Sequence, residues 1–214
     1  LTEFVTAHEA IVRMRAALAG SQGLDRAKLL DQLIEAYDKL GNEHADIKAW
    51  TGEIIALDAD KKAGLKAKYQ FRQFVAEASE LKGNRKYDEA KAVYDKALAL
   101  PGIGGEMKQE AYFAQGECCF YLRDFVGVVA CLKKALEAAP GSSKTANIQA
   151  MIERFSPTAE AQESVAKLKG QLDTAQGLDR AKLLDQLIEA RTKLAQAVPD
   201  PTLAQDVEKW SREI

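Results

Sequence analysis

The residues of this sequence with the most distinctive chemistry are three cysteines, Cys118, Cys119 and Cys131, which fall within one short stretch. The two histidines, His8 and His44, lie far upstream. A structural zinc site needs four ligands at a characteristic spacing, such as two Cys-x-x-Cys pairs, and the sequence contains none. We therefore expect neither a metal ion nor another cofactor.

A catalytic cysteine needs an activating base beside it, whereas the neighbours of these cysteines are mostly apolar. Because an apolar setting raises the pKa of a thiol, we expect three reduced core thiols. Cys119 and Cys131 stand at similar distances from a turn predicted near Arg123 and Asp124, so a single bridge between them stays open. The sequence has no Gly-rich phosphate loop, no Gly-x-Ser-x-Gly and no His-Glu-x-x-His. It therefore predicts a protein that is not an enzyme.

The composition favours a helical globular protein, with 47% hydrophobic and 29% charged residues, 14 Gly and only 5 Pro. No apolar run approaches the roughly 20 residues of a membrane-spanning helix, so we expect no membrane insertion. The 30 basic and 32 acidic residues alternate without blocks, which argues against nucleic acid as a partner. We expect a mature fragment without a signal peptide, and the compartment, cytoplasmic or exported, stays open.

The chain contains an internal duplication, because residues 22–36 and 176–190 share the same fifteen letters, QGLDRAKLLDQLIEA. A weaker match joins residues 47–54 to residues 207–214, with six extra residues in the second copy at a loop that contains Pro199 and Pro201. We predict a first copy at 1–58 and a truncated second copy at 156–214. The chain is expected to be a fragment of a longer repeat-containing protein.

The identity of the duplicated helix exceeds what packing requires, since the segments before it, 8–21 and 162–175, agree at only two of fourteen positions. The shared polar face either binds something, such as the neighbouring unit or the same partner twice, or reflects gene conversion, or only keeps the helix soluble. This duplicated polar face comprises Asp25, Arg26, Lys28, Asp31, Gln32 and Glu35 in the first copy and Asp179, Arg180, Lys182, Asp185, Gln186 and Glu189 in the second. Trp50 and Trp210 occupy equivalent places, and each either marks a binding hot spot or covers a helical core.

Between the two copies lies a pattern of small and aromatic residues that occurs twice, 38 residues apart. Its members are Phe74, Ala78, Leu81, Tyr87, Ala90, Tyr94 and Ala97, and then Tyr112, Gly116, Cys119, Phe125, Val128, Leu132, Ala135 and Pro140. The region from about 71 to 142 resembles two tetratricopeptide repeats, although Val128 replaces a small residue and neither unit has the family's tryptophan. The resemblance implies a right-handed α-α superhelix of antiparallel helical hairpins.

The 3.6-residue period and the helix breakers predict an all-α protein without strands. Short links make successive helices antiparallel neighbours, so we expect one α-solenoid over 1–214 with a tetratricopeptide-like core at 59–155. The predicted helices are 3–19, 24–40, 43–57, 59–82, 86–99, 105–122, 125–138, 143–154, 158–174, 178–196 and 202–214.

The resemblance implies a protein that binds a protein or peptide in a concave groove lined by the first helix of each hairpin. By that resemblance the groove residues are Arg72, Glu110, Phe113, Glu117, Phe120 and Tyr121. Alternatively, the loop 101–105 or the helix after Ser142 covers Phe113 and Phe120.

A scaffold whose successive repeat units contact one another stays open as a form of this binding function. Two further functions also stay open. The stretch 54–66 resembles segments beside thioredoxin-like domains, so the chain is alternatively an accessory region of a larger exported redox protein. The third possibility is a purely structural array unit.

Overall fold

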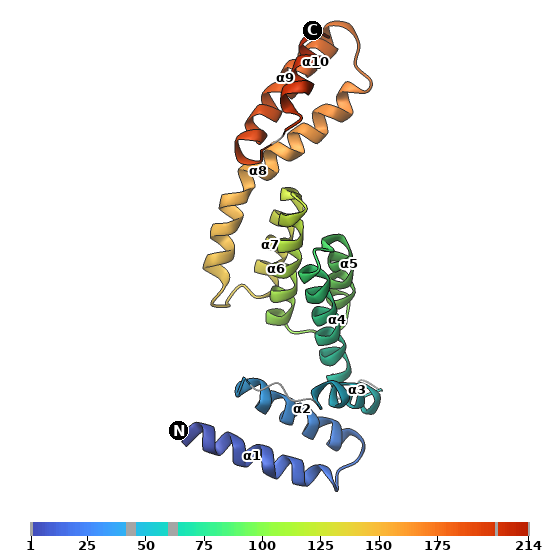
Figure 1. The fold of residues 1–214 in the computed structure, drawn as a ribbon, viewed down its shortest axis with the longest axis vertical. Helices are drawn as coiled ribbons and strands as arrows, with labels where there is room; N and C mark the ends of the chain where they lie inside the picture. Colours follow the sequence, from blue (N-terminus) through green and yellow to red (C-terminus); the bar gives the residue numbers. More distant parts are fainter. Residues whose placement is uncertain (1, 42–45, 60–63, 200, 214) are drawn as a thin grey trace. The chain divides into compact units, whose positions relative to one another are not determined.

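The computed structural model describes residues 2–41, 46–59, 64–199 and 201–213, with side chains from residue 8 onward. Helices make up 81% of the described residues and no strand occurs among them, which confirms the all-α prediction (Figure 1). The helices are α1 (Thr2–Leu18), α2 (Gly23–Lys39), α3 (Ile47–Leu57), α4 (Leu65–Gly83), α5 (Tyr87–Leu98), α6 (Gly105–Tyr121), α7 (Phe125–Ala138), α8 (Thr145–Leu172), α9 (Gly177–Ala197) and α10 (Leu203–Ser211).

The chain divides into two compact units. The first comprises Leu1–Asn84 with Ala92–Gly104, and the second comprises Arg85–Lys91 with Gly105–Ile214, so α5 contributes to both. In the first unit α1 packs on α2, α2 on α3, and α4 on both α2 and α3; in the second, α6 to α10 pack in chain order. The single solenoid over the whole chain stays a prediction.

In the first unit, α2 and α4 share an apolar core. Ala27, Leu30 and Ile34 of α2 form one buried cluster with Leu65 and Tyr69 of α4. Their spacing places each set on one helical face, as an amphipathic helix requires.

The start of α4 lies later than the predicted residue 59. Gly64 takes the left-handed conformation (φ +69°), which glycine adopts without the strain of a Cβ, and α4 begins at Leu65. The buried Asp58 carboxylate accepts a hydrogen bond from the backbone N–H of Lys66 (2.9 Å) and so satisfies one orphan donor of the new helix.

In the second unit, α6 and α7 form an antiparallel hairpin in which glycines of α6 lie against α7 at two places. A Cβ added to Gly105, at the start of α6, would lie 2.2 Å from the carbonyl oxygen of Ala138, at the end of α7. Further along, a Cβ on Gly116 would lie 3.4 Å from Cβ of Cys131. Gly116 therefore lies at the crossing of α6 and α7, where a methyl group would just touch α7 and a larger side chain would collide with it.

Replacing Gly116 by leucine is expected to lower the free energy of unfolding by about 1–3 kcal/mol, because the side chain overpacks the crossing. Alanine at the same position meets Cys131 at a tolerable distance and should cost less. Urea denaturation followed by circular dichroism measures both. Equal stability of the wild-type and leucine proteins would contradict the assigned crossing.

The prediction of separate helices at 143–154 and 158–174 is wrong, because α8 runs continuously from Thr145 to Leu172 with Pro157 inside it. Proline removes one backbone donor and crowds the preceding turn, which kinks a helix without necessarily ending it. The Ser156 hydroxyl donates to the Ile152 carbonyl (2.7 Å), a contact that also bends helices. Figure 1 shows α8 changing direction part-way along. Its first arm packs on α7 and its second on α9.

The N-terminus of α7 has all four orphan N–H groups satisfied. Oε1 of Gln162, on the second arm of α8, accepts from the N–H groups of Phe125 (2.8 Å) and Val126 (3.2 Å). The Asp124 side chain accepts from the N–H of Gly127 (2.8 Å), and the N–H of Asp124 donates to the Cys119 carbonyl (2.9 Å). Nε2 of Gln162 also donates to the Arg123 carbonyl (2.9 Å). One glutamine thus joins α8 to the turn between α6 and α7.

Candidate functional site

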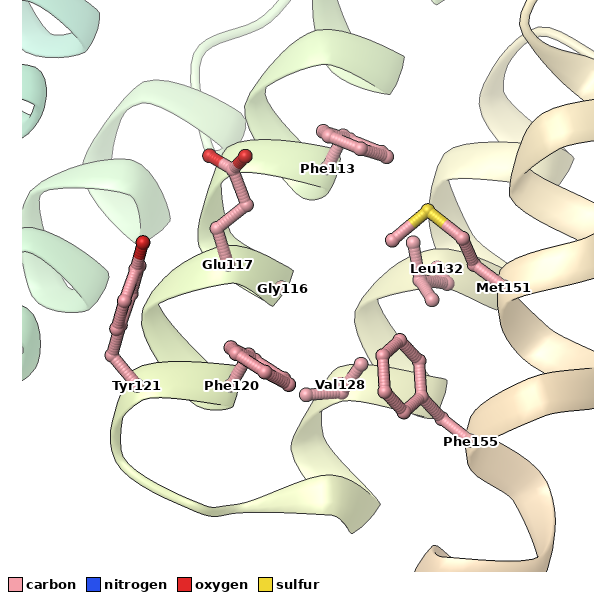
Figure 2. A pocket seen from close by; sticks show the side chains of 9 residues that line it. All are labelled: Phe113, Gly116, Glu117, Phe120, Tyr121, Val128, Leu132, Met151 and Phe155. Atoms are coloured by element: carbon pink, nitrogen blue, oxygen red, sulfur yellow. The ribbon is translucent and has the colours of Figure 1, made fainter.

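A pocket with a volume of about 260 Å³ opens between α6, α7 and α8. We call it the aromatic pocket, and it is lined by Phe113, Gly116, Glu117, Phe120, Tyr121, Val128, Leu132, Met151 and Phe155. Figure 2 shows Met151 and Phe155 entering from α8 opposite Glu117 and Tyr121 of α6. Gly116 contributes space because it has no side chain. All lining residues belong to the second unit.

The aromatic side chains of this pocket remain partly open to solvent. Phe120 is 45% exposed and Tyr121 58% exposed, although both are large and apolar. The Phe120 ring lies 5.7 Å from that of Phe155, and the Tyr121 ring stacks on Tyr87 at 4.7 Å. Such contacts hold the rings in defined positions, so they form a pre-organised apolar surface.

A second, larger hollow of about 560 Å³ adjoins the aromatic pocket and shares Phe120, Tyr121 and Phe155 with it. Two arginines line this hollow. The exposed Arg154 lies over the Phe155 ring at 5.6 Å, and Arg123 donates to the Pro199 carbonyl (3.1 Å). The hollow is therefore basic, whereas the aromatic pocket carries the half-buried carboxylate of Glu117.

The structure brings together four of the six predicted groove residues, Phe113, Glu117, Phe120 and Tyr121. Glu110 is exposed and pairs with Lys144 (2.6 Å), outside this lining. Arg72 belongs to the first unit, where it pairs with Asp38 (3.0 Å) and lies over the Tyr69 ring.

The alternative in which the helix after Ser142 approaches these aromatic residues is confirmed in part. Phe113 packs, as do Met151 and Phe155 of α8, against one buried cluster that contains Ile148 of α8, but Phe120 remains exposed. Sequence reasoning did not assign Met151, Arg154 and Phe155 to the site, because the resemblance placed the groove residues on the first helix of each hairpin only. Their spacing along one face of α8 is the signal that identifies them.

The three cysteines are buried and unbridged, as expected. The expectation that an apolar setting raises every thiol pKa is wrong for Cys119. Hydrogen bonding from Cys131 lowers the pKa of Cys119 to about 7, against the opposing effect of burial, and the positive charge of Lys91 lowers it further. The same hydrogen bond and burial raise the pKa of Cys131.

Replacing Cys131 by alanine is expected to raise the pKa of Cys119 towards the ordinary thiol range, because the main group that stabilises its thiolate is lost. The measurement is the ultraviolet absorbance of the thiolate against pH. Both proteins carry Cys118→Ala, so Cys119 is the only thiol left in the protein that also carries Cys131→Ala. A midpoint that stays near 7 after the substitution would show that Lys91 alone suffices.

The duplicated arginines make the same contacts in both copies. Arg26 donates to the Leu18 carbonyl (2.7 Å) and pairs with Glu53. Arg180 donates to the Leu172 carbonyl (2.9 Å) and pairs with Glu213 (2.7 Å). Each arginine thereby satisfies a helix C-terminus and joins it to a carboxylate near the C-terminal end of its own copy. Their identity has an intramolecular explanation.

Two of the other polar positions differ between the copies in their surroundings. Asp31 and Glu35 bond to α4, whereas Asp185 and Glu189 are exposed. The remaining six, which face solvent in both copies, are Asp25, Lys28 and Gln32 and their counterparts Asp179, Lys182 and Gln186.

Both tryptophans take part in helical cores. Trp210 is buried in a cluster with Val165, Leu184 and Leu187, and the Arg191 guanidinium lies 5.2 Å from its ring. Trp50 is half-buried, with its ring 5.9 Å from that of Tyr37.

Within the described ranges, no three His, Cys, Asp or Glu side chains are grouped so as to hold a metal ion. His8 is exposed, and His44 lies outside the described residues. No helix in the part of the chain that the structure describes has the length and apolar character to cross a membrane. Comparison with protein-family models, curated proteins and solved structures finds no match to this chain, so the chain's own geometry supports the assignments that follow.

Proposed function

We propose that this chain is a non-enzymatic interaction module of the tetratricopeptide type, and that it captures a peptide segment in the aromatic pocket. The observation that carries the proposal is the solvent-exposed aromatic surface around Phe120 and Tyr121. Large apolar side chains left open beside a pocket are typical of protein–protein interaction sites. The antiparallel α6–α7 hairpin, with Gly116 at its crossing, supports the tetratricopeptide assignment.

The size of the aromatic pocket favours a peptide side chain over a small-molecule substrate. Its volume of about 260 Å³ falls below the roughly 300–1,000 Å³ of typical small-molecule sites. A single aromatic or branched aliphatic side chain fits such a space as an anchor. The rest of the peptide then crosses the larger hollow beside it.

The charges that line the site determine a second feature of the partner, besides its apolar anchor. Arg123 and Arg154 line the hollow next to the aromatic pocket, so an acidic residue beside the apolar anchor is complementary to them. Glu117 lines the aromatic pocket itself, so a second acidic residue is disfavoured there. The proposed ligand is therefore a peptide with an apolar anchor and an acidic residue on one side of it.

Selection of random displayed peptides against the whole chain tests this function. Binders should share an aromatic or aliphatic anchor next to an acidic residue. The double change Phe120→Ala and Tyr121→Ala should abolish their binding without loss of helicity, because both side chains are already largely exposed. Arg154→Glu should select basic residues in place of acidic ones.

The matched control is Val12→Ala, which shortens an equally exposed apolar side chain (57%) in the first unit. Binding should be unchanged in this variant. Peptides that bind the Phe120→Ala and Tyr121→Ala protein as tightly as the wild type would refute the proposed site.

A further inference from the structure

The first copy of the duplicated helix shows what its polar face binds. Nζ of Lys68, on α4, lies 2.6 Å from an oxygen of Asp31 and 2.7 Å from an oxygen of Glu35. The Tyr69 hydroxyl donates to the same Asp31 oxygen (2.8 Å). Burial by itself would lower the pKa of Lys68, but the hydrogen bonds to both carboxylates outweigh it and raise that pKa. The lysine is therefore held charged in this interface.

Apolar contact accompanies these polar bonds. Leu65 and Tyr69 of α4 are buried in one cluster with Ala27 and Ile34 of α2. Leu65, Lys68 and Tyr69 follow the spacing i, i+3 and i+4, so they lie on one face of α4. The duplicated helix thus has two carboxylates and an apolar stripe that together bind a helix with this signature.

The second copy carries the same residues, and within the described part of the chain no helix covers them as α4 covers the first copy. Asp185 and Glu189 correspond to Asp31 and Glu35 and are exposed. Ala181 and Ile188 are half-buried, whereas their counterparts in the first copy are fully buried. At the start of the same stripe, Leu178 is 72% exposed, the largest value among the large hydrophobic residues that the structure describes. Glu189 pairs only with Lys193, one turn along its own helix, in a solvent-exposed contact.

We propose that this face of α9, formed by Ala181, Asp185, Ile188 and Glu189, is a docking site for a helix of a partner protein. The occupant carries α4's signature, a leucine followed three and four positions later by lysine and tyrosine. The lysine bridges Asp185 and Glu189, the tyrosine hydroxyl donates to Asp185, and the leucine covers Ala181. The site shares no residue with the aromatic pocket, so each of the two proposals can be tested and refuted independently of the other.

One difference between the copies changes the sequence that we expect in the partner helix. In the first copy Arg72, one turn beyond Lys68, pairs with Asp38 (3.0 Å). The residue equivalent to Asp38 in the second copy is Thr192, which cannot form an ion pair. A helix bound to the second copy therefore needs the lysine and the tyrosine but gains little from an arginine at the next turn.

A fluorescent peptide with the sequence of residues 64–83 serves as the probe, added to the whole chain and followed by fluorescence anisotropy. We expect saturable binding that weakens with added salt. Asp185→Asn with Glu189→Gln should weaken it about tenfold or more, since both anchor points of the lysine are lost. In the peptide, Lys68→Ala with Tyr69→Ala should abolish binding, whereas Arg72→Ala should leave it unchanged.

The matched control is Glu160→Gln with Glu163→Gln on α8, which removes the same charge from two other exposed residues of the second unit. The proposal is overturned if the wild-type chain does not bind the peptide, or if the control weakens binding as much as the change on α9. It is also overturned if the chain self-associates through Asp185 and Glu189, because the occupant would then be a second copy.

Discussion

Replacing Trp210 by alanine is expected to lower the free energy of unfolding by about 3–5 kcal/mol, the range for a truncated buried tryptophan. Trp210 is 9% exposed and is one of four buried residues in the cluster between α8, α9 and α10. Its removal leaves a cavity that the remaining leucines cannot fill, and it uncovers the aliphatic part of Arg191. Urea denaturation followed by circular dichroism measures the loss.

The equivalent change Trp50→Ala provides the comparison within the same molecule. Trp50 is only half-buried, so we expect a smaller loss of about 1–3 kcal/mol. An equal effect of the two substitutions, or a negligible effect at Trp210, would contradict the packing described. A negligible effect at both tryptophans would also favour a binding role for them over a structural one.

Replacing Gly105 by alanine is expected to cost about 3 kcal/mol, at the upper end of the usual penalty for overpacking. The new Cβ would lie 2.2 Å from the Ala138 carbonyl oxygen, and a backbone atom cannot move aside as a flexible side chain does. Relief requires that the start of α6 and the end of α7 separate. That movement also disturbs the buried Gln109, which donates to the carbonyls of Ala135 and Ala139.

Gly104→Ala is the matched control, because a Cβ on the neighbouring glycine meets no atom within 4 Å. We expect its effect on the free energy of unfolding to stay within about 0.5 kcal/mol. Thermal and urea denaturation of the two single variants give the comparison. Indistinguishable stabilities would contradict the close approach of the two helices.

Local signals in the sequence predicted most of the fold. The predicted helices at 105–122 and 125–138 differ from α6 and α7 by at most one residue at each end. Gly104 and Gly105 mark the start of the first, and Asp124 is a favourable N-cap residue for the second. Pro157 misled the prediction because its cost is offset by packing of both arms of α8, which no local pattern reveals.

The candidate site was predictable only where it lies on one helix. The resemblance to tetratricopeptide repeats predicted that Phe113, Glu117, Phe120 and Tyr121 of α6 line one groove, and they line one pocket. Met151 and Phe155 complete that pocket from α8, and their contribution depends on tertiary packing. The lowered pKa of Cys119 likewise depends on hydrogen bonding from Cys131 of α7 and on the charge of Lys91 of α5.

The duplication illustrates a separate limit of sequence reasoning. Identical letters predicted identical helices, and the shared contacts of Arg26 and Arg180 agree with this. The exposure of Asp31 and Asp185 nevertheless differs, because only the first copy is followed by α4 in the described structure. Whether a residue is buried depends on the neighbours of its helix as much as on the sequence of that helix.

The glutamine that closes the start of α7 has a consequence for the order of folding. The amides of Phe125 and Val126 have their acceptor on Gln162, on the far side of the proline kink. The hairpin can therefore form before the second arm of α8 docks, but its turn is completed only afterwards. In hydrogen–deuterium exchange these two amides should report the detachment of α8, while amides deeper in α7 report the opening of the hairpin itself.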